Sequence, residues 1–354
     1  MTLETSSTPL DLKLRPLSGP TETAALSALL DRAFPVPPGF HFLDDFPIWN
    51  ADLAQDTSSQ FLRLGGFSNQ QLVCFAGVRI TKIKTQQGLL PIAIVGGVCT
   101  HPDWRGKQLA STIVSAAVQW ASQQNAALIA LWGSEHDLYR RLGFELCGSQ
   151  VRVPLSGLNY THHAETVQTG FTAGIFAALI NRPSGLALSV QDLPWIKAHK
   201  NVHWFWSGSA NQPTAYAALG KGIDLPDLVH EWGGTAPALN RLLASVHAQS
   251  PYAALLAHPN QLKDLGISYS ADVTEFLCMV RVLNPSAILN AWRPGIPHSI
   301  IPKQNGFAIS VKNSPSIQFT FHETARLFFG PGQFEEAFGE TFPIPLWLWG
   351  LDGA

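Results

Sequence analysis

The sequence is poor in charged residues, which make up only 14% of its 354 residues, against roughly a quarter in a typical soluble domain. The 23 lysines and arginines nearly balance the 25 aspartates and glutamates, giving a formal net charge of −2. Proteins that bind nucleic acids usually carry a basic excess that meets the phosphates. The composition therefore argues against a nucleic-acid partner, and its low charge leaves room for a subunit interface in a homo-oligomer.

Cysteine is also scarce, and its four copies (Cys74, Cys99, Cys147 and Cys278) form no CxxC pair. A disulfide framework or a zinc site needs closely spaced or paired cysteines, so we expect free, mostly buried thiols in a reducing compartment and no metal site. The N-terminus lacks the basic and apolar regions of a signal peptide. The longest apolar runs, such as 170–180, are shorter than the roughly 20 residues that span a bilayer. These features predict a soluble, cytoplasmic protein.

What the chain does contain is a regular alternation of predicted helices and strands. Residues 1–10 are expected to be a disordered lead-in, and the order that follows, up to about residue 155, is α–β–β–β–α–β–α–β. A similar cycle begins near residue 170, and a short α/β tail begins near 275. We predict an α/β protein with mixed central sheets in three domains, which are residues 1–155, 156–275 and 276–354.

The most informative segment joins two of these elements. A nearly continuous apolar run at 89–100 predicts a buried strand, and an amphipathic helix is predicted over 111–124. Between them lies HPDWRGKQLA (101–110). The unpaired N–H groups at a helix N-terminus attract anions, and Arg105 and Lys107 add positive charge. On spacing alone, a pyrophosphate site and an ordinary turn with solvated basic residues both remain open.

This loop resembles the signature of the GNAT (GCN-five-related N-acetyltransferase) superfamily, Arg/Gln-x-x-Gly-x-Gly/Ala after a "V-x-V-x-P" strand. Here the segment runs from Val98 to Ala110. The strand ALIALWGSE and the segment LYRRLGF (138–144) match two further features of the family. Gln108 replaces the family's central glycine. If that position needs a positive φ, glutamine costs on the order of 1–3 kcal/mol.

The resemblance implies an N-acetyltransferase that moves the acetyl group of acetyl-CoA, its co-substrate, to a primary amine by direct attack. Tyr139 lies at the family's general-acid position, where it would protonate the leaving thiolate. The pantetheine arm would lie along residues 98–100 and the pyrophosphate on residues 106–111. The implied cofactor-binding residues are Val98, Cys99, Thr100, Arg105, Gly106, Lys107, Gln108, Leu109, Ala110 and Ser111.

The general base has three candidates. Glu135 is the carboxylate nearest in sequence to Tyr139, although a surface carboxylate at the start of the next helix is an equally good interpretation. The other two are the C-terminal carboxylate of Ala354, which serves this role in one group of the family, and water. His101 is interpreted as part of the scaffold.

Two aromatic segments are candidates for the acceptor site. The loop at 40–46 contains His41, Asp44 and Asp45, and residues 203–206 read His-Trp-Phe-Trp. Apolar walls with some negative charge would suit a cationic amine on a hydrophobic body. The acceptor is otherwise expected to be a small molecule or a peptide.

The rest of the chain resembles the tandem-GNAT proteins of the enhanced-intracellular-survival type. In that type a degenerate second GNAT fold follows the first, and a sterol-carrier-like domain closes the chain. Residues 229–234 lie where a second cofactor loop would be, but they lack the motif. Met279 to Pro285 resembles the start of an abbreviated tail domain. The alternative function is a non-catalytic protein that binds CoA or a hydrophobic ligand on a degenerate GNAT fold.

Overall fold

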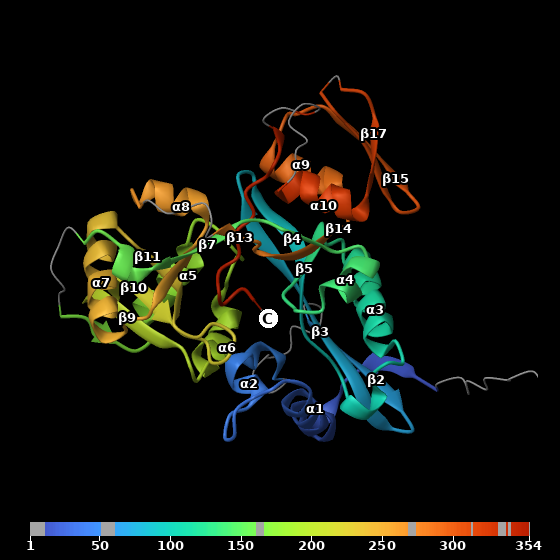
Figure 1. Cartoon of the computed structure of the whole chain (residues 1–354), viewed down its shortest axis with the longest axis horizontal. Coiled ribbons are helices and arrows are strands. Elements are labelled where there is room, and N and C mark those ends of the chain that lie inside the picture. The colour runs from blue at the N-terminus through green and yellow to red at the C-terminus, as the bar shows by residue number, and fades with distance from the viewer. Residues whose placement is uncertain are drawn as a thin grey trace, which may run out of the picture.

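The computed structural model describes residues 11–50, 61–160, 166–267, 274–312, 314–331, 338 and 341–353. Within these ranges the chain forms two seven-stranded sheets and one three-stranded sheet, with helices packed against them (Figure 1). The predicted class, mixed α/β with two similar halves and a small C-terminal module, is confirmed. The predicted lead-in at residues 1–10 and the terminal Ala354 lie outside the described residues.

The first sheet has the strand order β1-β2-β3-β4-β5-β14-β6. Its strands are β1 (Lys13–Pro16), β2 (Phe61–Ser68), β3 (Gln71–Thr85), β4 (Gly88–Thr100), β5 (Leu128–Leu131), β14 (Cys278–Val282) and β6 (Glu145–Cys147). Its helices are α1 (Gly19–Ala33), α2 (Phe42–Asp45), α3 (Leu109–Gln123) and α4 (His136–Arg141). Strands β4 and β5 are parallel, so α3 is the crossover between them, as expected for parallel neighbours.

Helix α3 is held to this sheet by an apolar stripe. Its buried residues are Leu109, Ile113, Val114, Ala117, Val118 and Ala121, at the three- and four-residue spacing of one helix face. They belong to a core cluster with Val73 and Val95 of the sheet. Helix α1 buries Leu26, Leu29 and Leu30 in a different cluster. Burial of this stripe fixes where α3 begins, and therefore where the loop before it lies.

The second sheet has the order β13-β7-β12-β11-β10-β9-β8. Its strands are β13 (Thr274–Glu275), β7 (Gln150–Pro154), β12 (Ala254–Ala257), β11 (Leu228–Gly234), β10 (Gln212–Leu219), β9 (His203–Ser209) and β8 (Gln168–Thr169). Its helices are α5 (Ala173–Asn181), α6 (Leu193–Ala198), α7 (Ala236–Gln249) and α8 (Pro259–Asp264). The parallel pair β11–β12, joined by α7, repeats the arrangement β4–α3–β5.

The two sheets exchange one strand each. Strand β7 follows β6 after two residues, but it pairs with β12 and β13 of the second sheet. Strand β14 follows β13 after two residues, but it pairs with β5 and β6 of the first sheet. The proposed boundary at residue 155 therefore places β7 in the first domain, although it belongs to the second sheet. The boundary at residue 275 places β14 in the third domain, although it belongs to the first sheet.

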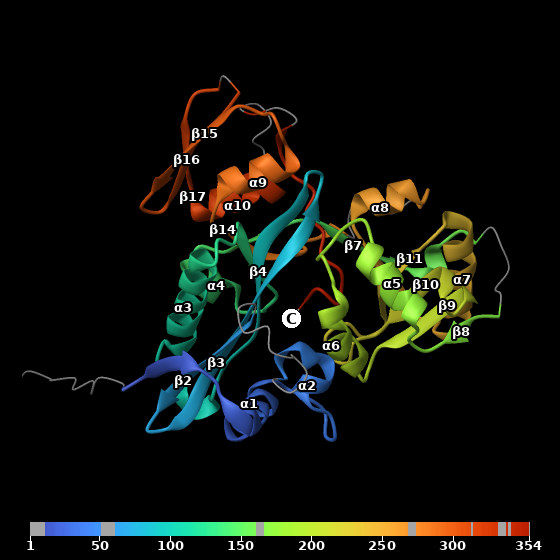
Figure 2. The same cartoon turned by 180° about the vertical axis from the view of Figure 1, so that it is seen from behind.

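The C-terminal module contains α9 (Pro285–Trp292), β15 (His298–Lys303), β16 (Gly306–Val311), β17 (Ile317–Thr320) and α10 (Phe321–Phe329). Its sheet and helices form a separate layer beside the first sheet in both ribbon views (Figures 1 and 2). The described segment 341–353 then returns to the space between the two large sheets, where the chain ends (Figure 1). None of the described helices is long and apolar enough to cross a membrane.

Residues 229–234, which lie where a second cofactor loop would be, belong to β11, and only Thr235 separates this strand from α7. The second half thus has no room for a loop like 101–108. Residues 203–206, expected to line a cleft, lie in β9, where Trp204, Phe205 and Trp206 are buried. His203, Trp204 and Phe205 line a cavity formed by residues of the second half. All four cysteines are free and buried, as predicted.

Candidate active site

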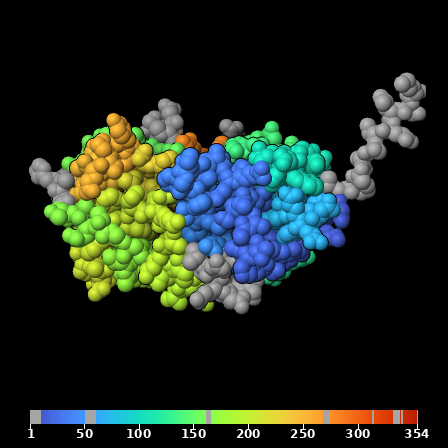
Figure 3. All heavy atoms as spheres, turned by 90° about the horizontal axis from the view of Figure 1, so that it is seen from below, coloured from blue at the N-terminus to red at the C-terminus, as the bar shows by residue number. Residues whose placement is uncertain are grey.

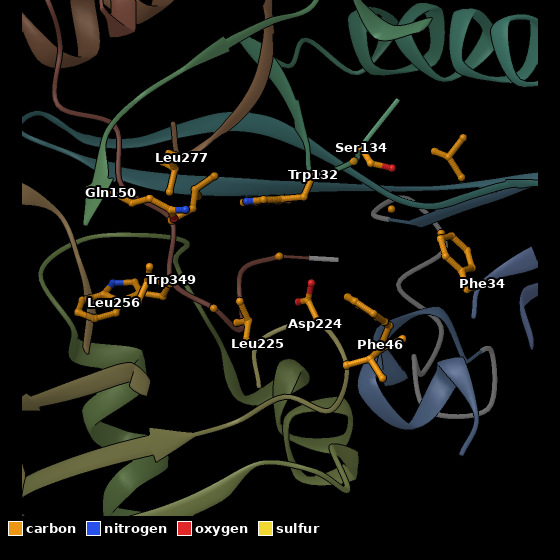
Figure 4. A pocket seen from close by; sticks show the side chains of 18 of the residues that line it. Phe34, Phe46, Trp132, Ser134, Gln150, Asp224, Leu225, Leu256, Leu277 and Trp349 are labelled. Atoms are coloured by element: carbon orange, nitrogen blue, oxygen red, sulfur yellow. The ribbon is translucent and has the colours of Figure 1, made fainter. Parts of the chain in front are cut away.

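A cavity of about 710 Å³ lies between the two large sheets. Residues of the first half, the second half and the C-terminal segment line it (Figure 4). The first half contributes Phe34, Phe42, Phe46, Gly96, Gly97, Val98, Trp132, Gly133, Ser134, Glu135 and Tyr139. The rest of the lining is Gln150, Arg152, Ile223, Asp224, Leu225, Leu256, Leu277, Leu348, Trp349, Gly350 and Gly353.

One side of the cavity is the place where β4 and β5 part. Their last paired residues are Val95 and Leu131, yet β4 continues to Thr100. From Gly96 to Cys99 it has one residue more than the opposing stretch of β3 between Gly77 and Phe75, which is a β-bulge. Beyond Val95, no described strand pairs with β4 on the β5 side. Backbone groups of Gly96 to Val98 are therefore available to an extended ligand arm lying in the gap.

The loop after β4 forms an open anion site at the start of α3. Gln108 is the N-cap residue, and its side chain makes no capping hydrogen bond. The first turn of α3 contains no acidic residue, so its N–H groups and the helix dipole face solvent without a negative partner. Gly106 has φ +77°, and nothing lies within 4 Å of where its β-carbon would be. This geometry fits a pyrophosphate approaching the backbone closely.

Gln108, which replaces the family's central glycine, has the positive φ that favours glycine. Its φ and ψ are 61° and 16°, in the left-handed region that costs a side chain about 1–2 kcal/mol. The two basic residues of the loop are exposed. Lys107 Nζ lies 4.4 Å from the centre of the Trp104 ring, and Arg105 donates a hydrogen bond of 3.4 Å to the carbonyl of Ala33. Both cations therefore lie beside the anion site.

Tyr139 lines the cavity from a rigid position. The side chain is only 5% exposed, and its ring packs edge-on against Phe144 with centroids 6.1 Å apart. Burial, together with the negative charge of Glu135, raises the pKa of Tyr139 to about 12. The phenol therefore stays protonated at neutral pH and is available as a donor.

Glu135 and His101 have different surroundings. Glu135 lies at the start of α4, is exposed, and lines the cavity near Tyr139. His101 is buried, with Nε2 3.0 Å from the guanidinium of Arg32 and Nδ1 accepting a hydrogen bond from the backbone N–H of Asp103. It does not line the cavity. These contacts agree with the interpretation of His101 as scaffold.

The charged residues of the aromatic loop, expected at the acceptor site, have other partners. His41 pairs with Asp31 at 2.7 Å, and Asp44 pairs with Lys200 at 2.7 Å. Asp45 is buried and accepts hydrogen bonds from the Asn201 side chain and the Ile223 backbone. None of His41, Asp44 and Asp45 lines the cavity. Asp44 and Asp45 thus join α2 to the second half, and the blue N-terminal part of the chain lies against the yellow-green second half in Figure 3.

Asp224 of the second half contributes a negative charge to the cavity. The sequence did not mark this residue as part of a site. It follows β10 in a short loop that begins at Lys221. The Lys221 ammonium is completely buried and donates hydrogen bonds to Asp224 Oδ2 at 3.1 Å and to the carbonyls of Gly350 and Gly353 at 3.2 and 3.1 Å. No motif marks this loop, because its role depends on contacts more than 100 residues apart.

The C-terminal segment is fixed by a second buried cluster. Arg182 donates to both carboxylate oxygens of Glu231, at 3.0 and 2.9 Å, and also to Asp352. Asp352 accepts from the backbone of Leu186 and Trp349, at 3.0 and 2.9 Å. One guanidinium is thus shared by two buried carboxylates. Burial raises the pKa of Glu231 to about 7, against the attraction of Arg182.

These two clusters bring Trp349, Gly350 and Gly353 into the cavity wall. The terminal carboxylate belongs to Ala354, which lies outside the described residues. Among the residues that the structure describes, no group of three or more His, Cys, Asp or Glu side chains could hold a metal ion.

Comparison with known proteins identifies the fold. Residues 14–147 match the family model described as an acetyltransferase (GNAT) domain. No curated protein matches the sequence. A GCN5-related N-acetyltransferase from Kribbella flavida is similar in structure, with a TM-score of 0.58 and 19% identity over 85% of this chain and 81% of that one.

Two other solved structures are similar over most of the chain. A GCN5-related N-acetyltransferase from Anabaena variabilis has a TM-score of 0.58 and 16% identity, covering 88% of this chain and 86% of its own. Eis1 from Mycobacterium abscessus has a TM-score of 0.53 and 14% identity, covering 79% and 76%. These likenesses extend across both halves, well beyond the matched domain.

Proposed function

From an N-terminal domain that belongs to the GNAT acetyltransferase family, we propose that the protein is an N-acetyltransferase that uses acetyl-CoA as co-substrate and a primary amine as acceptor. The observation that carries this proposal is the junction of three features. These are the unpaired edge of β4 at Gly96 to Val98, the uncapped start of α3, and Tyr139, which lines the same cavity as that edge.

The proposed binding mode follows these features in space. The pantetheine arm lies along β4 at Val98, Cys99 and Thr100, in the gap left by β5. The pyrophosphate lies on the loop and the first turn of α3, where N–H groups and cations attract it. The proposed contacts there are Arg105, Gly106, Lys107, Gln108, Leu109, Ala110 and Ser111. The acetyl group then lies in the cavity near Tyr139.

Transfer needs a neutral amine that attacks the thioester carbonyl carbon, so that a C–N bond forms and the C–S bond breaks. The sulfur leaves with the bonding electrons as a thiolate that accepts a hydrogen bond from the Tyr139 hydroxyl, while the nitrogen loses one proton to a base, and this proton ends on the sulfur. With a pKa of about 12, Tyr139 is a weaker acid than an ordinary thiol near 8.5. It therefore acts by donating its hydrogen bond as negative charge develops on sulfur, and it keeps its own proton unless the proton from the base replaces the one that it passes to the sulfur.

Glu135 is the proposed catalytic base because it lines the cavity and lies close enough to Tyr139 to affect the phenol's pKa. The carboxylate of Ala354 and water are the alternatives. Gly353 lines the cavity, which supports the first of these two. Unchanged turnover in a Glu135→Gln variant would exclude Glu135 as the base and leave the Ala354 carboxylate and water as candidates.

The proposal is tested by calorimetry with acetyl-CoA and by thiol release in the presence of amines. We expect saturable binding, and release of free CoA that depends on the amine. The panel should contain arylalkyl monoamines, lysine, peptide N-termini, polyamines and aminoglycosides. Absence of binding at about 1 mM acetyl-CoA, which is the upper end of typical KM values, would exclude an acetyl-CoA-dependent enzyme.

The second candidate is a non-catalytic protein that binds CoA or a hydrophobic ligand, and the observation that favours it is Gln108. A strained, side-chain-bearing residue stands where the loop approaches the phosphates. Binding of CoA without amine-dependent thiol release for any member of the panel would support this candidate. The three-domain division and the sterol-carrier-like nature of the C-terminal module also remain proposals.

A further inference from the structure

Among the residues that the structure describes, Asp224 is the one acidic residue that the second half contributes to the cavity. Its carboxylate faces Trp132 across the cavity, with Phe46 nearby (Figure 4). The side chain is 35% exposed, so the group is accessible from the cavity although it lies on a rigid loop. The loop is rigid because the Asp45 carboxylate accepts the N–H of Ile223 and would overlap any side chain at Gly222.

The carboxylate of Asp224 retains unused hydrogen-bonding capacity. Lys221 donates only to Oδ2, and its other two contacts are the carbonyls of Gly350 and Gly353. An ammonium has three N–H donors, so Lys221 is saturated by these acceptors. Among the described residues, Oδ1 of Asp224 has no hydrogen-bond donor within range. It is therefore able to accept a donor from a molecule in the cavity.

The charges around the cavity favour a cation at this position. Its acidic groups are Asp224 and Glu135, and its basic lining residue, Arg152, is already paired with Glu275 at 3.0 Å. The Lys221 ammonium lies behind Asp224, fully buried. Lys221 offsets part of the charge of Asp224, but Glu135 has no such partner among the described residues. A ligand carboxylate would therefore meet repulsion at Glu135 without finding an unpaired cation among the described lining residues.

The shape of the wall favours an apolar body on that cation. Phe34, Phe42 and Phe46 form a continuous stack, with ring centroids 4.5 and 4.6 Å apart, and all three line the cavity. Trp132 and Trp349 face the same space. A polycation would have to remove its further charges from water against these rings, with Glu135 as the one other carboxylate among the described lining residues, which is costly. A single ammonium on an aromatic or branched aliphatic group would not.

We infer that the acceptor is a monoamine carried on an aromatic or branched apolar body, and that Asp224 is the specificity-determining residue that binds its ammonium form. This inference rests on the proposed function for the fate of the amine, which must lose a proton before it attacks acetyl-CoA. The binding step itself requires no catalysis. It can therefore be tested separately.

The test compares ligands that cannot be acetylated. N,N-dimethyl-2-phenylethylamine is protonated at pH 7 and keeps one N–H, whereas 2-phenylethanol has the same ring and no charge. We expect the amine to bind the full-length protein at least tenfold more tightly than the alcohol, measured by calorimetry, and to bind more tightly than spermidine. Asp224→Asn should abolish the preference for the amine over the alcohol.

The matched control is Asp264→Asn, which removes the same charge from an exposed residue at the end of α8, outside the cavity. It should keep the preference. Equal binding of amine and alcohol by the unmutated protein would overturn the role of Asp224 whether or not the variant folds. Tighter binding of spermidine would overturn the apolar-body class. If the preference is present but no amine is acetylated, the proposed function fails and this inference stands.

Discussion

The ring of Tyr139 lies directly against the backbone of Gly133, where a β-carbon would be 2.9 Å from Cε2 and 3.3 Å from the hydroxyl oxygen. The absence of a side chain at residue 133 thus lets the phenol reach the cavity wall. Phe144 packs on the ring from another direction. The position of the ring is therefore determined by packing and would not change if the hydroxyl were removed.

This packing makes Tyr139→Phe a clean test of the proposed acid. The variant keeps the ring and loses the donor, so we expect kcat to fall about 100-fold, within the range for general acid catalysis. Affinity for acetyl-CoA should remain nearly unchanged. Tyr160→Phe is the matched control, because Tyr160 is also a partly buried phenol, with its hydroxyl on the carbonyl of Leu155 and away from the cavity. Full turnover in Tyr139→Phe would remove Tyr139 as the acid.

Gln108→Gly should improve the cofactor loop. Glycine relieves a left-handed strain of about 1–2 kcal/mol, offset partly by its greater freedom in the unfolded chain. We expect the free energy of unfolding to rise by up to about 1 kcal/mol and the Kd for acetyl-CoA to fall, since the backbone can approach the phosphates more closely. Asn125→Gly, at a left-handed position after the other end of α3 (φ 59°), should leave the Kd unchanged. A weaker Kd in Gln108→Gly would show that the glutamine side chain contributes to binding.

The buried carboxylate of Glu231 should make stability depend on pH. Its pKa is raised in the folded protein to about 7 from an ordinary value of 4.5. The folded state thus binds the proton more tightly, so its contribution to stability is complete below about pH 4.5 and is lost as the pH rises through 7. Glu231→Gln mimics the protonated form. Relative to this variant, the unmutated protein should lose on the order of 3 kcal/mol between pH 4.5 and 8.

The difference between the two proteins is the quantity to measure, by urea unfolding at several pH values. Burial lowers the pKa of the neighbouring His230 to about 4, which acts in the opposite direction over an overlapping range, but His230 is present in both proteins. Glu275→Gln, at an exposed glutamate, is the control and should show no such trend. A difference that stays constant with pH would mean that Glu231 remains ionised beside Arg182 throughout.

Gly222→Ala should disturb the contact between the two halves. The new β-carbon would overlap the carboxylate of Asp45 at a position whose φ is +57°, so strain and steric overlap combine. We expect a loss of about 2–4 kcal/mol in the free energy of unfolding. Gly39→Ala separates the two effects, because φ is +85° there but nothing lies within 4 Å. It should cost about 1 kcal/mol, and equal losses in both variants would mean that the overlap is relieved without cost.

The local elements of the first half were predictable because short-range patterns determine them. The apolar stripe of α3 and the continuous apolar run of β4 are visible in the sequence, and the loop between them carries a motif. The bulk of the cavity lining was not predictable. Asp224, Trp349 and Gly350 reach it through pairings such as Lys221–Gly350 and Arg182–Asp352, and no local pattern encodes contacts between residues so far apart.

The prediction for the aromatic loop failed for a related reason. Composition indicated acidic groups near an acceptor, and such groups do occur in the loop. Only the fold shows that Asp44 and Asp45 are used by Lys200 and Asn201 of the other half. The phenylalanines of this region do line the cavity, so its apolar character was inferred correctly while its charge was assigned to the wrong residues.

The exchange of β7 and β14 has a consequence for how the chain is made. During synthesis, β5 and β6 emerge long before residues 278–282, the strand that lies between them and pairs with both. The first sheet therefore keeps a gap until about four fifths of the chain has left the ribosome, and its unpaired strand edges are exposed during that time. A fragment ending near residue 155 would carry the same gap permanently. Expression of the isolated N-terminal half should consequently yield an aggregation-prone product, whereas a fragment extending beyond residue 282 would have all the strands of both large sheets.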